Sequence, residues 1–400
     1  MENIKRRKIC TLDDKISPVL NVELLPNEIL MNIFSHLNIN DLYKCAQVSK
    51  KFRQISHDKS FWKCVNLDSQ SVSCEFITQI IKLGTEYLNL QGAFLMDDVD
   101  TDLPRENNLK YLNLEESAID DQFLAKLLRS SKSLEKLSLA GVNTSDQYYR
   151  QSDWNHSKDM LQVRTTWYLE CVLPNAKMLT TLDLRRKSKK DCSVNLDSIK
   201  EIILVCDQLR EANFEWQKNI EDDLDFFANN LSTKIEKLNI SYIGFHDQHL
   251  VKLLKRCKNI TELDLYCCNL HEDVSVYGRN NTEQRTLMAI SENLSESLVK
   301  LQLPDHSIIY PGFLNSLPKL KYLWHQGRYC CKSKLYCSSK YSLCATRQMK
   351  SQFPQIAFEL YLGNTQIANC ANEYFEPKLG FWEFKCTAVD LDFPRTTRLD

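Results

Sequence analysis

The sequence is poor in glycine and proline, with nine and ten residues respectively in a chain of 400. Because these residues dominate flexible linkers, their scarcity argues against a mostly disordered chain. Long apolar runs are also missing: no stretch approaches the roughly 18 apolar residues of a membrane span, and the N-terminus lacks the apolar core of a signal peptide. We therefore expect an intracellular protein without membrane contact, whose cysteines stay reduced.

A charge excess is absent as well, because the formal net charge is −1. No global electrostatic argument therefore favours nucleic acid as a partner. The few glycines leave little material for a phosphate-binding loop, and no cysteine or histidine occurs in a recognisable catalytic context. We expect a chain that is not an enzyme and that uses no cofactor.

Four late cysteines are the one group that invites a metal interpretation: Cys330, Cys331, Cys337 and Cys344, with His325 nearby. Zinc sites usually pair cysteines about two to four residues apart. Here 0, 5 and 6 residues intervene. Ordinary thiols are therefore the preferred interpretation and no metal is predicted, with a zinc-binding protein as a weaker alternative.

What the sequence does contain is a repeat. The pattern L-x-x-L-x-L, followed by a helical stretch, starts at residues 85, 109, 134, 179, 209, 235, 260, 298 and 320. Most gaps match the period of leucine-rich repeats, about 20–29 residues. The L-x-L core alternates its side chains as a strand does, and the apolar spacing after it is typical of a helix. The predicted fold class is α/β, with parallel strands on a concave face and helices on the convex one. Insertions at 144–160 and 271–284 have no assigned role.

Residues 23–65 follow a different, helical pattern. Ile29, Ile33, Phe34 and Leu37 are predicted to share one apolar face, and Asn40-Asp41 to cap a second helix. So small a module either caps the end of the repeat array or completes its core against a partner. Periodicity alone leaves both interpretations open.

The residues themselves resemble an F-box in order, identity and spacing. The matching stretches are L-P-x-E-I-L at 25–30, I-F-S-H-L at 33–37, V-S-K-K-F at 48–52 and F-W-K at 61–63. F-boxes bind a Skp adaptor, which links them to a cullin scaffold with its RING subunit. The positions that would form or support this interface are Leu25, Pro26, Glu28, Ile29, Leu30, Ile33, Phe34, Leu37, Leu42, Val48 and Trp62.

An F-box followed by leucine-rich repeats is similar to the F-box/leucine-rich-repeat class of ubiquitin-ligase substrate receptors. The resemblance implies that the chain recruits proteins for ubiquitination and proteasomal degradation. The alternative is an interaction protein that binds the Skp adaptor but does not act in a cullin ligase. The implied organisation is a tail at 1–22, the F-box at 23–65, repeats at 66–353, and a last repeat with a C-terminal tail at 354–400.

Two further segments, FWKCVNL at 61–67 and GFWEFKC at 380–386, are similar more loosely to one member of this class. That resemblance implies phosphorylated cell-cycle regulators as substrates and a small cyclin-kinase-subunit accessory protein. The basic run KRRK at 5–8 resembles a nuclear localisation signal, so we expect nucleus and cytoplasm. A second run, RRKSKK at 185–190, is either a solvated surface or a contact for an acidic or phosphorylated partner.

The residues that alternate with the inward leucines are expected to face solvent on the concave side. They include Tyr111, Asn113, Asp183, Glu211, Asn213, Glu215, Lys237, Asn239 and Glu262. Aromatic side chains are enriched at interfaces, and several gather late in the array. We predict a substrate or accessory-protein patch from Arg185, Asp264, Tyr266, Tyr322 and Trp324. Packing of Phe381, Trp382 and Phe384 on these aromatics is the open alternative.

Overall fold

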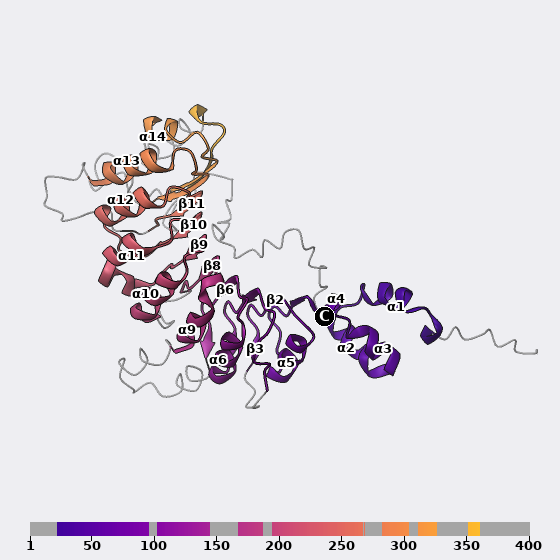
Figure 1. Ribbon diagram of the computed structural model, residues 1–400. Coiled ribbons are helices and arrows are strands. Elements are labelled where there is room, and N and C mark those ends of the chain that lie inside the picture. The colour runs from indigo at the N-terminus through magenta and orange to yellow at the C-terminus, as the bar shows by residue number, and fades with distance from the viewer. Residues whose placement is uncertain are drawn as a thin grey trace, which may run out of the picture. The chain divides into compact units, whose positions relative to one another are not determined.

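The computed structural model describes residues 22–95, 102–144, 167–186, 194–266, 268, 282–303, 311–325 and 351–360. The chain forms two compact units, one ending at Trp62 and the other beginning at Lys63 (Figure 1). Within the described residues no helix is long and apolar enough to cross a membrane. Several sequence predictions concern residues outside these ranges: the runs at 5–8 and 187–190, most of both insertions, the cysteines at 330–344 and the aromatics at 381–384.

The first unit is a set of short helices around an aromatic and aliphatic core. Its elements are η1 (Val22–Leu24), α1 (Asn27–Phe34), α2 (Ile39–Val48), α3 (Lys50–Ser56) and α4 (Lys59–Trp62). Phe34 packs edge-on against Phe52, with the ring centroids 5.2 Å apart. The buried indole of Trp62 donates its Nε1–H to the carbonyl of Ser56 at 2.6 Å. These contacts satisfy the one polar group that the Trp62 ring brings into the core.

The start of α2 differs from the prediction by two residues. Asn38 is the N-cap, and its Oδ1 accepts from the amide of Asp41 at 2.8 Å. Asn40 and Asp41 therefore lie inside the helix rather than capping it. Ser49 caps α3 in the same way, by accepting from the amide of Phe52 at 3.2 Å. Caps of this kind satisfy amides that have no partner within the helix.

The second unit is built on a parallel sheet of 11 strands in the order β1-β2-β4-β6-β8-β9-β10-β11-β12-β13-β14. Nine of them begin two residues after the predicted repeat starts: β2 (Tyr87–Asn89), β4 (Tyr111–Asn113), β6 (Lys136–Ser138), β8 (Thr181–Asp183), β9 (Glu211–Asn213), β10 (Lys237–Asn239), β11 (Glu262–Asp264), β12 (Lys300–Leu303) and β13 (Tyr322–His325). The sheet is extended by β1 (Cys64–Asn66) at one edge and β14 (Ala357–Leu360) at the other. The predicted α/β fold class is confirmed.

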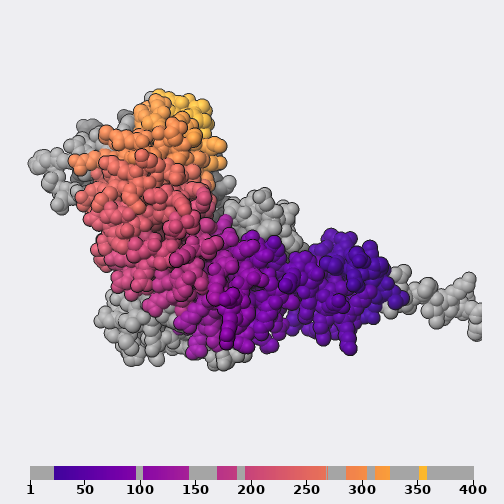
Figure 2. Space-filling model, in the orientation of Figure 1, coloured from indigo at the N-terminus to yellow at the C-terminus, as the bar shows by residue number. Residues whose placement is uncertain are grey.

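Helices follow the strands along the chain and lie on one side of the large sheet (Figure 1). They are α5 (Cys74–Lys82), α6 (Asp121–Ser130), α9 (Trp167–Val172), η2 (Leu173–Met178), α10 (Leu196–Val205), η3 (Lys218–Asp223), α11 (Leu224–Asn230), α12 (Asp247–Arg256), α13 (Thr282–Leu294) and α14 (Pro311–Asn315). A small parallel sheet, β3 (Phe94–Leu95), β5 (Ala118–Ile119) and β7 (Asn143–Thr144), joins the early repeats. In the space-filling view the repeats of this unit succeed one another in sequence order (Figure 2).

The core lies between the large sheet and its helices. Leu112, Leu137 and Leu182 are partners in register on β4, β6 and β8, and each is almost fully buried. Burying one such side chain contributes about 1.5–3 kcal/mol. The periodic leucines that revealed the repeat therefore also stabilise it, and they leave the other face of each strand for polar and aromatic residues.

One register position on that other face carries an asparagine or aspartate in most repeats: Asn66, Asn89, Asn113, Asp183, Asn213, Asn239 and Asp264. In each, the side-chain oxygen accepts from the amide two residues further on, at 2.9–3.2 Å. Such bonds satisfy backbone amides where a strand ends.

This repeated bond corrects the expectation that the alternating residues face solvent. Asn113, Asp183, Asn213, Asn239 and Asp264 are all buried, and so is Tyr111. The polar side chains of this position fold back onto their own backbone, so their first role is structural. Glu211, Glu215, Lys237 and Glu262, by contrast, are half-buried and retain some exposure.

Candidate functional site

The first unit carries apolar side chains on its surface as well as in its core. On α1, Leu30 and Phe34 are buried, whereas Ile29 and Ile33 are 47% and 42% exposed. Ile29 and Ile33 are four residues apart and therefore lie on one face of the helix. The single apolar face predicted from periodicity is thus two faces, one turned into the domain and one turned outward. An outward apolar face on so small a unit is typical of a binding surface.

The chain just before α1 adds to this surface and is held in place by Lys51. The ammonium of Lys51 donates to the carbonyls of Glu23 and Leu25, both at 2.7 Å. Leu24 is left 81% exposed by this arrangement, and Pro26, the N-cap of α1, is exposed too. Leu24 was missed by the sequence analysis because no helical period includes it, although it directly precedes the Leu25-Pro26 pair.

Two exposed side chains on α2 belong to the same group of outward apolar residues. Val48 is exposed, as the adaptor-binding set predicted, and Tyr43, which the sequence analysis missed, is exposed as well. We name the exposed apolar residues of this unit the outward apolar set: Val22, Leu24, Ile29, Ile33, Tyr43 and Val48.

The predicted adaptor-binding residues divide by burial into two groups. Pro26, Glu28, Ile29, Ile33 and Val48 are exposed and available to a partner, and Leu25 and Leu37 are half-buried. Leu30, Phe34, Leu42 and Trp62 are buried in the unit itself. This second group shapes the domain, so a substitution there would act through folding. Binding by any of these residues stays a prediction.

In the second unit, the predicted substrate residue Arg185 lies in a group of carboxylates. Its guanidinium is 2.6 Å from Glu115 and 3.3 Å from Asp183, and both carboxylates are almost fully buried. Burial alone would lower the pKa of Arg185, but the charges of Asp183, Glu115, Glu215 and Glu116 outweigh it and raise the pKa. The Arg185 guanidinium is thus engaged within the protein.

Asp264, also predicted for the substrate patch, has different surroundings. Its Oδ1 accepts from the amide of Tyr266 at 2.9 Å. Burial raises the pKa of Asp264 well above its usual range; the Tyr266 amide lowers it, and the charge of Glu215 raises it further. Asp264 is therefore a buried, structural carboxyl group rather than an exposed recognition residue.

Aromatic side chains form a continuous series across the late repeats. Trp216 stacks on Tyr242 with ring centroids 4.0 Å apart, Tyr242 meets Tyr266 edge-on at 5.0 Å, and Tyr266 meets Trp324 edge-on at 5.1 Å. We name Trp216, Tyr242, Tyr266 and Trp324 the aromatic series. The structure brings together the predicted Tyr266 and Trp324. Tyr322 is not a member of the aromatic series. It is 46% exposed, and the ammonium of Lys300 lies 5.8 Å from the centroid of its ring.

Trp216 and Tyr242 were missed by the sequence analysis, but a signal for them exists. Each follows the Asn of its repeat by three residues, and both have positive φ angles of 67° and 60°. The corresponding position of two earlier repeats is Gly92 or Gly141, with φ of 63° and 62°. A left-handed conformation costs a residue other than glycine roughly 1–2 kcal/mol. Ser69 and Glu116 follow Asn66 and Asn113 by three residues and also have positive φ angles, both 57°. The left-handed backbone therefore belongs to the turn of the repeat, and the aromatic side chains are what distinguishes the late repeats.

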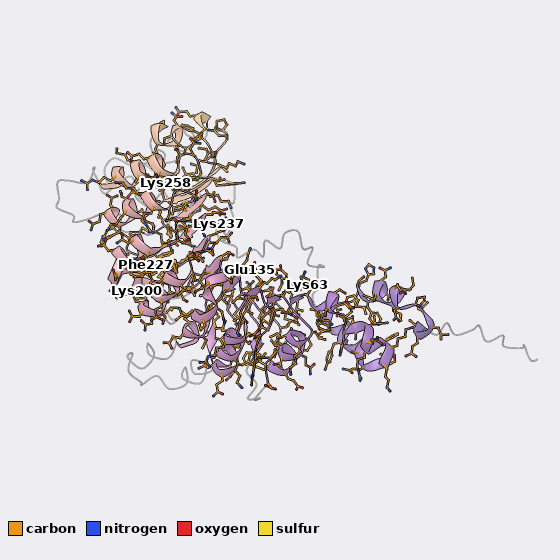
Figure 3. All side chains as sticks on the ribbon, viewed as in Figure 1. Lys63, Glu135, Lys200, Phe227, Lys237 and Lys258 are labelled. Carbon is orange, nitrogen blue, oxygen red and sulfur yellow. The ribbon has the colours of Figure 1, made fainter. Side chains whose placement is uncertain are left out.

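Charged side chains alternate in sign along the first residue of neighbouring strands. Lys237 pairs with Glu211 at 2.9 Å and Lys300 with Glu262 at 3.1 Å. Burial alone would lower the pKa of Lys237, but its bond to Glu211 and the nearby acidic groups raise it. Lys237 lies on the strand side of the array, whereas Lys200 belongs to the helix side (Figure 3). This row is balanced in charge and forms cross-strand pairs.

Buried thiols of the repeats have structural partners. Cys206 donates to the carbonyl of Ala176 at 3.2 Å and Cys257 to that of Ser232 at 3.5 Å. Burial raises the pKa of Cys206 to about 12 and that of Cys257 to about 11. Both thiols stay protonated at neutral pH and are poor nucleophiles. Among the described residues, no cluster of His, Cys, Asp and Glu side chains could hold a metal ion.

Comparisons with known proteins agree with the first unit. An F-box-like family model matches residues 22–68. The chain is 48% identical over 74 residues to the ubiquitin ligase complex F-box protein UFO1 of Saccharomyces cerevisiae, a match that covers 18% of this chain and 11% of that protein. It is 46% identical over 39 residues to the F-box/LRR-repeat protein 5 of Xenopus tropicalis, covering 10% of this chain and 6% of that protein.

Among solved structures, a crystal structure of a TLR13–ssRNA13 complex overlaps 66% of this chain and 28% of its own, with 17% identity and a TM-score of 0.29. The matches to the two curated relatives span only about a tenth of their length or less. The chain therefore carries an F-box-like domain at its N-terminus. In this chain the domain is followed by parallel strands with helices on one side.

Proposed function

We propose that the chain is the substrate-recognition subunit of a Skp–cullin–F-box ubiquitin ligase. One observation carries this proposal: an F-box-like domain whose own core is complete presents Ile29 and Ile33 outward on α1. A helix that only capped the repeat array would have no reason to expose them. F-box proteins generally act as substrate receptors in such ligases, and an F-box domain implies a Skp-type adaptor as its partner.

The proposed mechanism is proximity rather than bond chemistry. The adaptor would hold the F-box-like domain near a cullin and its RING subunit, while the repeats hold a substrate. Binding of this kind raises the effective concentration of substrate lysines near a ubiquitin-charged enzyme. The thiols of Cys206 and Cys257, protonated at neutral pH, are consistent with a non-catalytic role.

The first experiment is affinity purification of the intact chain from cells, with partners identified by mass spectrometry. The test variant is Ile29→Ala/Ile33→Ala, since both side chains are exposed and their loss leaves the core intact. Leu30, which is fully buried, is unsuitable because its truncation would unfold the domain. The matched control is Leu204→Ala/Met288→Ala, which truncates exposed apolar residues of the second unit.

The proposal predicts that adaptor and cullin both co-purify with the wild type and with the control variant. Neither should co-purify with Ile29→Ala/Ile33→Ala. Adaptor without cullin would instead establish the alternative, an interaction protein outside the cullin ligase. If neither partner co-purifies with the wild type, the first unit would be only a cap at the end of the repeat array. The same spectra test the finer predictions: phosphorylated cell-cycle substrates and a small cyclin-kinase-subunit protein. Fluorescence imaging of the tagged chain tests the predicted location in nucleus and cytoplasm.

A further inference from the structure

Among the exposed large apolar side chains of the described residues, Leu24 has the highest exposure, 81%. It is the last residue of η1, just before α1. Its two neighbours in the chain, Glu23 and Leu25, are both half-buried. The segment before α1 therefore lies against the first unit and leaves the side chain of Leu24 outside it.

The backbone on both sides of Leu24 is held by a single ammonium group. Nζ of Lys51 donates to the carbonyl of Glu23 and to that of Leu25, each at 2.7 Å. The amide of Leu25 also donates to the carbonyl of Val22 at 3.2 Å. Hydrogen bonds from a charged donor are among the stronger ones in proteins. Leu24 is thus both exposed and fixed in position.

Lys51 contributes little to its own helix. It lies in the first turn of α3, which begins at Lys50 and has no acidic residue in that turn. A positive charge in a first turn is unfavourable, because the positive end of the helix dipole lies there. What Lys51 contributes is therefore its pair of bonds to residues 23 and 25, which lie 28 and 26 positions earlier in the sequence.

Leu24 extends the outward apolar face of α1. It precedes Pro26, the N-cap of α1, by two residues, so the two Cα atoms are at most about 7 Å apart. Ile29 and Ile33 follow on the helix, 47% and 42% exposed. A side chain that is fixed before binding loses less conformational entropy on binding than a mobile one. The partner that covers Ile29 and Ile33 is therefore the partner suited to cover Leu24.

We propose that Leu24 is an anchor residue of the adaptor interface and that Lys51 is the residue that positions it. This inference rests on the proposed function, because the partner is the Skp-type adaptor. Leu24 binds directly, by burying its side chain against an apolar surface of the adaptor. Lys51 acts through Leu24, by keeping its bonds to the carbonyls of Glu23 and Leu25.

The experiment is isothermal titration of the purified adaptor into the purified full-length chain. The test variants are Leu24→Ala, Lys51→Met and the double variant Leu24→Ala/Lys51→Met. Lys51→Arg is the conservative variant, because a guanidinium can also donate to two carbonyls. The matched control is Lys50→Met, which makes the same change at the adjacent, exposed position of the same helical turn. Thermal melting is measured for every variant.

Leu24→Ala should weaken adaptor binding about tenfold, the effect of losing one buried leucine contact. Lys51→Met should have a similar effect, and the double variant should bind no more weakly than Leu24→Ala, because both changes remove the same contact. Lys51→Arg and Lys50→Met should bind as wild type does. The melting temperature of Leu24→Ala should equal that of wild type, since the side chain is exposed.

Wild-type affinity of Leu24→Ala would overturn the proposal. So would independent effects of the two changes, with the double variant about a hundredfold weaker than wild type, because Lys51 would then act on binding without Leu24. A lowered melting temperature of Leu24→Ala would show that Leu24 packs within the chain, which also contradicts an anchor for a partner.

A second measurement separates this inference from the proposed function. Hydrogen exchange of the free chain, followed by mass spectrometry on a peptide that spans residues 22–30, requires no adaptor. Lys51→Met should exchange faster there than wild type and Lys50→Met, and equal exchange would overturn the positioning role.

The two proposals also fail in different ways during titration. Absence of adaptor binding by wild type would contradict the proposed function, and with it the anchor role of Leu24. Wild-type binding by Leu24→Ala together with loss of binding by Ile29→Ala/Ile33→Ala would contradict only the anchor role.

Discussion

Asp183 and Asp264 occupy the same register position of the large sheet, yet their carboxyl groups have opposite surroundings. Each accepts from the amide two residues further on, that of Arg185 in one case and of Tyr266 in the other. Asp183 has the guanidinium of Arg185 at 3.3 Å. Asp264 has an aromatic neighbour instead, and burial raises its pKa.

The difference shows that the same bond from side chain to backbone amide occurs in two different electrostatic surroundings. The Asn or Asp of each repeat satisfies its own backbone amide, whatever its charge. The residue two positions later then decides whether a carboxylate there is neutralised by an ion pair or merely desolvated. The repeats from β4 to β8 carry an ion-paired network, and those from β9 to β13 carry the aromatic series.

The largest expected effect is on the ion-paired side. Arg185→Met keeps most of the side-chain volume but removes the guanidinium that pairs with the buried Glu115 and Asp183. Because breaking a buried ion pair is costly, we expect a loss of about 3–5 kcal/mol in the free energy of unfolding. Urea denaturation measures it. Arg210→Met is the control, since its partner Glu236 and Arg210 itself are largely exposed, and such pairs contribute about 0–1 kcal/mol. Equal effects of the two substitutions would contradict the network.

Next in size, the two aspartates should respond in opposite directions to the same change. Asp183→Asn removes the charge of one of the two carboxylates that pair with Arg185, so we expect destabilisation by about 1–3 kcal/mol. Asp264→Asn keeps the bond to the Tyr266 amide, as Asn113, Asn213 and Asn239 do, and removes a desolvated charge. We therefore expect it to stabilise the protein at neutral pH by on the order of 1 kcal/mol. Destabilisation by both would remove the distinction between the two regions.

The pH dependence of Asp264→Asn follows from the sign of the pKa shift. Because the folded pKa of Asp264 is raised above its usual 3.8, the folded state binds the proton more tightly than the unfolded state. Wild type consequently loses stability as the pH rises from about 3.8 through the raised value. The advantage of Asp264→Asn should appear over that range and vanish below it. Denaturation midpoints measured from pH 3 to pH 8, in steps of about one unit, test this.

The smallest expected effect concerns the aromatic region. Tyr242→Gly relieves the left-handed backbone, which is worth roughly 1–2 kcal/mol, and loses ring contacts worth about 0.5–1.5 kcal/mol each. The two effects largely offset each other, so urea denaturation should show a change of only about 1 kcal/mol in the free energy of unfolding. At Gly92 the reverse applies: Gly92→Ala places a Cβ 3.1 Å from Oγ of Ser69 at a φ of +63° and should destabilise. A larger loss of stability with Tyr242→Gly would show that the aromatic series mainly stabilises the fold.

The sequence predicted the parts of the fold that depend on periodic burial. The L-x-x-L-x-L units placed nine strands correctly because leucines such as Leu112 and Leu182 must face the core in every repeat. The helical module before them was predicted for the same reason. Periodicity could not separate the two faces of α1, because Ile29 and Leu30 are both apolar and only the packing shows which of them is buried.

The candidate sites were predicted less completely. Arg185 and Asp264 carry charges that look exposed in a strand pattern, but their roles depend on neighbours from other repeats, which one sequence does not reveal. Trp216 and Tyr242 lie in the turns after their strands, where the backbone has a positive φ angle. The periodicity of apolar residues does not reveal this conformation. The Asn at the strand end was read as a surface residue because its bond to the backbone depends on the local turn.

The central claim is that the outward apolar residues of the first unit bind a Skp-type adaptor independently of the repeats. Isothermal titration of the purified adaptor into the purified chain tests it most directly. Wild type and Leu204→Ala/Met288→Ala should bind with equal affinity, and Ile29→Ala/Ile33→Ala about ten- to a hundredfold more weakly, as the loss of two apolar contacts implies. Equal affinity of all three proteins would contradict the claim.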